Sequence, residues 1–122
     1  SMLLAILNRH TGISTHAYDV FLNVVGGLQI VETSADLPTL FAILSSLRNQ
    51  TLPADLIVFG EIGLGGEIRP ISGGQERLKE AAKHGFKTAI VPKGNASKKA
   101  IDGLNVIAVS TLKEAVDRME NL

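Results

Sequence analysis

The sequence contains no cysteine and no tryptophan, and aromatic residues make up only 4% of its 122 residues. The absence of cysteine excludes disulfides, thiolate metal sites and cysteine nucleophiles. The scarcity of aromatic side chains excludes a stacking platform for the bases of single-stranded nucleic acid. The chain shows no apolar run near the roughly 18 residues that a transmembrane helix needs and no leader that is first charged and then apolar. We therefore expect a cytoplasmic protein that makes no contact with a membrane and has an aliphatic core.

Hydrophobic residues, at 45% of the chain against 20% charged residues, are frequent enough to predict a folded domain. The length is that of one ordinary domain, and no repeat or linker interrupts the sequence. Ser1-Met2 is typical of a tag-cleavage scar or a domain boundary, and the helical pattern after it begins without a cap. We therefore expect residues 1–122 to be a single domain excised from a longer protein.

The net charge of zero conceals an uneven distribution of charge along the chain. Residues 69–99 contain eight basic and two acidic residues, a net charge of +6, whereas residues 1–68 carry −4 and residues 100–122 carry −2. A basic segment of this kind is compatible with a nucleic-acid surface and equally with a solvated face that balances acidic neighbours. Charge alone leaves both interpretations open.

Periods of two and of 3.6 residues alternate along the chain, which predicts an α/β fold with a mixed sheet covered by helices. Short apolar runs bounded by glycine or proline indicate strands, and apolar residues at helical spacing indicate helices. The predicted strands are residues 20–25, 28–30, 56–59, 67–69, 88–91 and 106–109, and the predicted helices are residues 34–48, 74–84 and 111–119.

The glycine turn in the stretch RPISGGQERLK, residues 69–79, raises the question of a phosphate loop. It lacks the Walker spacing of two glycines four residues apart followed by Lys and Ser or Thr. Gly63, Gly65 and Gly66 match a dinucleotide fingerprint only loosely, because no helix follows them. Ser72 stands three residues before Gln75, the spacing of a capping box, so we predict that Ser72 caps the next helix.

Two further helix starts carry the same kind of capping pattern, Thr33 with Asp36 and Thr111 with Glu114. The three histidines and the scattered carboxylates share no metal-ligand spacing, so the sequence predicts no metal site. No serine lies in a G-x-S-x-G elbow, which leaves a Ser-His-Asp triad without support in the sequence.

Three ordered stretches of this chain resemble the proteolytic domain of the Lon protease family. They are Glu32-Thr33-Ser34-Ala35-Asp36 with the helix after it, then Gly60-Glu61-Ile62 through Pro70-Ile71 to Gly74, and lastly Lys87-Thr88 with Ile90-Val91-Pro92. The resemblance covers nearly the whole chain from Asp19 to Met119. It implies a two-layer Lon-like fold and a site in which a serine attacks the peptide carbonyl while a lysine removes its proton.

That resemblance places Ser34 at the nucleophile position and Gln75 at the position of the base. A carboxamide holds a hydrogen bond but cannot accept the serine proton near neutral pH, so the dyad is broken. Asp36 replaces the usual glycine and puts a carboxylate near any oxyanion that would form. We therefore expect no catalytic residue in this domain, unless Lys79, one helical turn after Gln75, replaces the missing base.

The sequences of residues 23–27, 32–36 and 75–86 resemble, more specifically, the C-terminal Lon-like domain of the bacterial RadA family of DNA repair proteins, also called Sms. In that family a zinc finger and a RecA-like ATPase precede this domain, and the hexameric whole is a branch-migration motor in DNA recombination. The resemblance implies that ATP, Mg and Zn belong to segments absent from this chain. It also implies DNA, further copies of the chain and a RecA-type recombinase as partners.

The leading hypothesis from these observations is an inactive Lon-like domain that supports oligomerisation and offers a basic surface to DNA. A residual Ser-Lys peptidase using Ser34 and Lys79 is the alternative, and a scaffold without DNA contact is a third. The candidate DNA-binding residues are the cations of the basic segment that follow the glycine turn: Arg77, Lys79, Lys83, Lys87, Lys93, Lys98 and Lys99.

Overall fold

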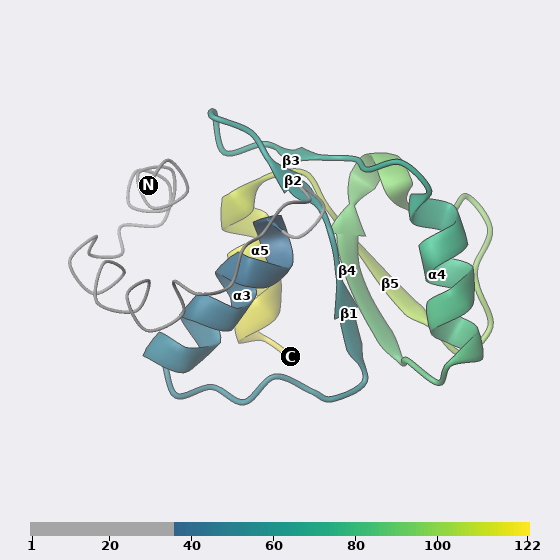
Figure 1. Cartoon of the computed structure of the whole chain (residues 1–122), viewed down its shortest axis with the longest axis horizontal. Coiled ribbons are helices and arrows are strands. Elements are labelled where there is room, and N and C mark those ends of the chain that lie inside the picture. Colours follow the sequence, from purple (N-terminus) through teal and green to yellow (C-terminus); the bar gives the residue numbers. More distant parts are fainter. Residues whose placement is uncertain (1–35) are drawn as a thin grey trace.

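The computed structural model describes residues 36–122, which alternate between helices and strands (Figure 1). The strands are short and the helices span two to three turns. In chain order the elements are α3 (Asp36–Leu47), β1 (Leu56–Val58), β2 (Glu61–Ile62), β3 (Ile68–Arg69), α4 (Gly74–Lys83), β4 (Thr88–Pro92), the 3₁₀ turn η2 (Lys93–Asn95), β5 (Asn105–Val109) and α5 (Leu112–Glu120).

A parallel sheet of order β1-β4-β5 forms the centre of the described part of the chain. Its middle strand β4 carries Ala89, Ile90 and Val91, each fully buried, because both faces of this strand are covered. The two short strands β2 and β3 pair in an antiparallel hairpin apart from that sheet.

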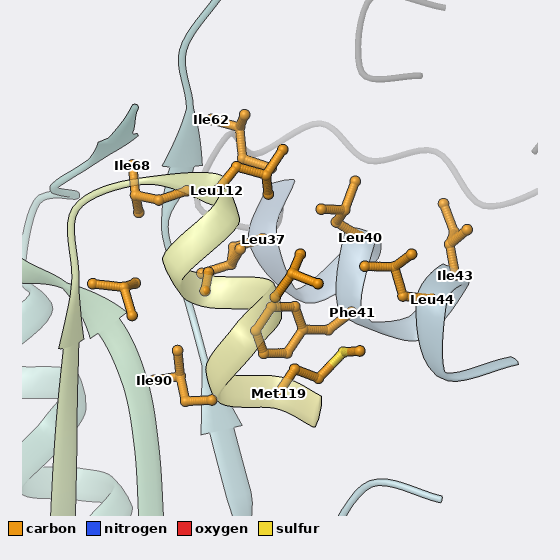
Figure 2. Packing of buried hydrophobic residues seen from close by; sticks show 13 residues of the cluster. Leu37, Leu40, Phe41, Ile43, Leu44, Ile62, Ile68, Ile90, Leu112 and Met119 are labelled. Atoms are coloured by element: carbon orange, nitrogen blue, oxygen red, sulfur yellow. The ribbon is translucent and has the colours of Figure 1, made fainter. Parts of the chain in front are cut away.

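Helices cover both faces of the parallel sheet, with α3 and α5 on one side and α4 on the other (Figure 1). The first face carries the larger apolar cluster, in which Phe41 of α3, Met119 of α5 and Ile90 of β4 meet (Figure 2). The second face carries a smaller cluster around Leu78 of α4 and Phe59. The helix that contains Gln75 and Lys79 is thus held to the sheet by the smaller of the two clusters.

The predicted α/β class is confirmed, and every helix and strand predicted between residues 36 and 122 is present. The observed arrangement has three layers within these residues, whereas the Lon resemblance implied two, because α4 packs on the face opposite α3 and α5. The hairpin strand β2 was not predicted, since two residues leave no readable period. The strands predicted at residues 20–25 and 28–30 lie outside the described residues.

The predicted cap of the last helix is confirmed: the Glu114 amide donates to Thr111 Oγ1 over 3.2 Å. Glu114 Oε1 in turn accepts from the Ser110 amide at 2.8 Å. We expect Thr111→Ala to lower the free energy of unfolding by about 1 kcal/mol, because one amide of the first turn loses its partner. Chemical denaturation measures the change, and Thr111→Ser, which keeps the hydroxyl, should retain most of the stability. Equal losses in both variants would contradict the role of the hydroxyl.

Candidate functional site

The start of α4 is organised by its backbone. Gly73 is the N-cap and adopts the left-handed conformation with φ of 70°, a region in which glycine has no steric penalty. The predicted capping box of Ser72 with Gln75 is wrong, because no side chain caps this helix. The left-handed residue lies one position after Ser72, so the helix begins one residue later than a Ser72 cap requires. Gln75 is left exposed in the first turn.

Asn95 fastens the turn before α4 to the end of β4. Its Oδ1 accepts from the Ile71 amide and its Nδ2 donates to the Ile71 carbonyl, both over 2.8 Å. Asn95 is only 7% exposed and is the one buried polar side chain in the part of the chain that the structure describes. Gly74 packs against it so closely that an added Cβ would lie 2.6 Å from Asn95 Cγ. The turn and η2 therefore form one unit.

A hollow of about 670 Å³ opens where these segments meet. One wall is the first part of α4, with Gln75 and Lys79. The opposite wall is η2 and the loop after it, which contribute Lys93, Lys98 and Lys99 together with small and apolar residues. Four ammonium-bearing side chains thus surround the position that the Lon resemblance assigns to the base.

The lining of this hollow is strongly cationic, because it includes four lysines and no aspartate or glutamate. Its four lysines form no ion pair with any residue between 36 and 122. The ion pair recorded for a lysine in that range joins Lys83 to Glu80, 3.6 Å apart on the exposed side of α4. The geometry therefore favours binding of an anion in the hollow.

Only some of the seven cations predicted to bind DNA line the same hollow. Lys79, Lys93, Lys98 and Lys99 meet at the hollow, whereas Arg77 lines a separate apolar hollow of about 400 Å³ between β1 and α4. Lys87 precedes β4 and Lys93 follows it, which separates the two by roughly 20 Å of extended chain. Four of the seven predicted residues therefore line the hollow, and Arg77, Lys83 and Lys87 do not.

Asp36 sits at the N-terminus of α3, where its Oδ2 accepts from the Ile62 amide at 3.1 Å. The Leu37 amide donates to the Gly60 carbonyl at 3.1 Å, so the start of α3 is tied to the segment between β1 and β2. Burial raises the pKa of Asp36 above its ordinary value, and it outweighs the opposing effect of the amide hydrogen bond. Ser34, and the Thr33 cap predicted for this helix, lie outside the described residues.

The raised pKa of Asp36 predicts a small pH dependence of stability. A carboxyl whose pKa is higher in the folded state stabilises the fold while protonated, and this contribution is lost as the pH rises through the folded-state pKa. Asp36→Asn keeps an acceptor for the Ile62 amide and has no charge to desolvate. Thermal unfolding at a series of acidic pH values should therefore show a flatter profile for the variant. A steeper profile in Asp36→Asn would contradict this assignment.

The β2–β3 hairpin carries a separate charged group in which Arg69 binds Glu67 at 2.7 Å and approaches Glu61 at 3.5 Å. Hydrogen bonds from its own backbone amide and then from Arg69 lower the pKa of Glu67.

Within residues 36–122 no group of three or more His, Asp or Glu side chains is arranged to hold a metal ion. No helix in the same range is both long and apolar enough to cross a membrane.

Sequence reasoning did not single out Asn95, the residue that joins the two walls of the hollow. An asparagine after Lys93-Gly94 has the sequence signature of an exposed turn. Its burial depends on the approach of Ile71 and Gly74, more than twenty positions earlier in the chain. No local pattern reports such a contact.

Several proteins similar to this chain are called DNA repair protein RadA. A protein of Pseudomonas aeruginosa called DNA repair protein RadA is 62% identical over 119 residues, 98% of this chain and 26% of the relative. The protein of that name from Escherichia coli is 54% identical over 100% of this chain, and the one from Aquifex aeolicus is 42% identical over 96% of it. In each case the match covers 26% of the relative. The chain thus spans about a quarter of the length of these curated relatives.

A family model matches residues 3–95, and its description is "Subunit ChlI of Mg-chelatase". The match begins before α3, includes the turn before α4 and ends at Asn95, so it contains the α4 wall of the hollow and leaves out the loop after η2. Because the matched stretch is well over half of the 122 residues, the chain belongs to the family that this model defines.

Proposed function

We propose that this chain is a non-catalytic, Lon-protease-like module of a DNA repair protein, in which it binds DNA phosphates and supports assembly. The relatives named DNA repair protein RadA, which match the whole chain at 54% identity or more, support a role in DNA repair. The observation that carries the DNA contact is the hollow beside Gln75, with four lysines, no carboxylate and no ion pair among the described residues.

Gln75 cannot supply the general base that a serine peptidase needs. Its carboxamide is exposed at the start of α4 and has no basic lone pair with which to activate a serine. Loss of a general base lowers a rate by roughly 10² to 10⁴. A former proteolytic site would in this way be free to hold an anion.

A mobility-shift titration of duplex DNA in rising salt tests the DNA contact. Each ammonium that neutralises a phosphate releases about one counterion, so log affinity should fall linearly with log salt. Lys98→Glu/Lys99→Glu should weaken binding by roughly tenfold or more and reduce the magnitude of the salt slope by about two. The matched control is Lys113→Glu/Arg118→Glu, which reverses two charges on α5, on the other face of the sheet.

Unchanged affinity in the Lys98→Glu/Lys99→Glu variant would remove the DNA role. Equal losses in both double variants would show that only net charge matters. The absence of aromatic side chains from the hollow predicts little dependence on base sequence, since phosphates and not bases would be contacted.

The longer protein would supply what this chain lacks. We propose that it is cytoplasmic, that it forms a hexameric ring engaged in recombination and branch migration, and that a RecA-type recombinase is a partner. Its ATP, Mg and Zn would bind segments other than this chain. Light scattering of the longer protein with and without residues 1–122 tests the assembly role: the ring should be lost or weakened by the deletion.

A residual peptidase using Ser34 is the second candidate, and one observation favours it. Lys79 lines the same hollow as Gln75 and therefore lies near the position of the missing base. Incubation of the chain with an unfolded protein substrate, with Ser34→Ala as the control, separates the two candidates. Cleavage that disappears in Ser34→Ala would establish the peptidase, whereas we expect no cleavage by either chain.

A further inference from the structure

The lysine-lined hollow has the dimensions of a small-ligand site. Its volume of about 670 Å³ falls inside the roughly 300 to 1,000 Å³ that such sites occupy. Lys79 projects from a helix while Lys93, Lys98 and Lys99 come from the facing loop, so the cations surround a single volume. Cations on two facing walls can act together on one compact anion.

The hollow also lies at a position in the fold that favours ligand binding. The hollow lies where β4 ends and α4 begins, which is the edge of a parallel α/β sheet at which ligands are commonly bound. The positive end of the α4 dipole adds to the field of the four ammonium groups. The Ser97 hydroxyl and the Gln75 amide line the same space and can donate hydrogen bonds without adding negative charge.

We propose that this hollow is a binding site for a compact polyphosphate anion, meaning linear inorganic phosphate chains or the phosphate chain of a free nucleotide. Two or three linked phosphates carry more negative charge and are longer than a single phosphate, so they can contact more of the four lysines at once. This goes beyond the DNA contact proposed above and adds a regulatory consequence that rests on it. Because Lys98 and Lys99 would serve both ligands, a bound polyphosphate would compete with DNA.

Calorimetric titration of the 122-residue chain with inorganic tripolyphosphate, pyrophosphate and orthophosphate at constant ionic strength tests the site directly. Affinity should rise with the number of phosphates, and sulfate should resemble orthophosphate. A parallel titration with ATP shows whether a nucleoside is accepted on the phosphate chain. Failure of tripolyphosphate to bind at millimolar concentration would overturn the proposal.

Matched variants locate the binding. Lys93→Gln/Lys98→Gln should weaken tripolyphosphate binding by about tenfold or more, because two charge-assisted contacts are lost. Lys83→Gln/Lys87→Gln also removes two positive charges, but at residues that do not line the hollow. Its effect on tripolyphosphate affinity should stay below about twofold. Equal losses in the two variants would show non-specific attraction and would overturn the site. Thermal unfolding of each variant checks that the fold is kept.

Substitutions that give residue 75 a positive or a negative charge test the location of the site. Gln75→Lys should tighten and Gln75→Glu should weaken tripolyphosphate binding, because the residue is exposed and lines the hollow and the two substitutions add charges of opposite sign. Opposite or absent effects would contradict the location.

Tripolyphosphate binding without DNA binding would refute the DNA contact and leave this site standing. If DNA binds, but tripolyphosphate neither binds nor displaces the DNA, the polyphosphate site is refuted and the DNA contact stands.

Discussion

Leu78→Ala is expected to lower the free energy of unfolding by about 2 to 5 kcal/mol, a large fraction of the stability of a domain of this size. Leu78 is fully buried and is the one large apolar side chain that α4 places in the core, beside Ala81 and Gly74. The cluster contains only four buried residues besides Leu78, so few neighbours can move in to fill the cavity. The loss should be visible in chemical denaturation.

Leu64→Ala is the control, since it removes the same atoms from the β2–β3 hairpin, where Leu64 is 63% exposed. A change below about 0.5 kcal/mol is expected there, because little buried area is lost. Similar losses in the two variants would mean that α4 is not anchored through Leu78. Because α4 carries one wall of the lysine-lined hollow, Leu78→Ala should also weaken anion binding at temperatures near its unfolding transition.

Local sequence was sufficient to predict the elements that depend on short-range patterns. The apolar spacing of Leu37, Leu40 and Leu44 predicts a helix with one buried face, and all three are fully or almost fully buried in α3. Gly85 after α4 has φ of 87°, as a helix end with a left-handed glycine requires. Thr111 caps α5 through the amide that its spacing predicts.

The remaining features depend on contacts between distant parts of the chain. The side of the sheet on which α4 packs is a consequence of the crossover between β1 and β4, and no period in the sequence encodes it. The charge count identified a basic segment but could not divide it, because the separation of Lys87 from Lys93 follows from the direction of β4. The hollow exists only because the chain after η2 returns to face α4.

The contact of Asn95 with Ile71 leads to the second large expected effect. Asn95→Ala removes two hydrogen bonds at once and leaves a backbone donor and a backbone acceptor of Ile71 without their partners. We expect a loss of about 2 to 4 kcal/mol in the free energy of unfolding, since each bond contributes about 1 kcal/mol and each unsatisfied group adds a penalty. Anion binding in the hollow should weaken as well, because the two walls lose their link.

Asn95→Asp separates the role of the hydrogen bonds from that of packing. An ionised carboxylate still accepts from the Ile71 amide but cannot donate to the Ile71 carbonyl, which it would face with like partial charge. Burial and that carbonyl would both raise the pKa of the new carboxyl in the folded state. A raised folded-state pKa gives stability that is present at low pH and lost as the pH rises through it. The variant should therefore be destabilised at neutral pH and should recover toward about pH 4, where a protonated carboxyl can donate to the carbonyl. Recovery in Asn95→Asp with none in Asn95→Ala would establish the two-bond contact, whereas parallel pH profiles for the two variants would show that Asn95 acts only by filling space.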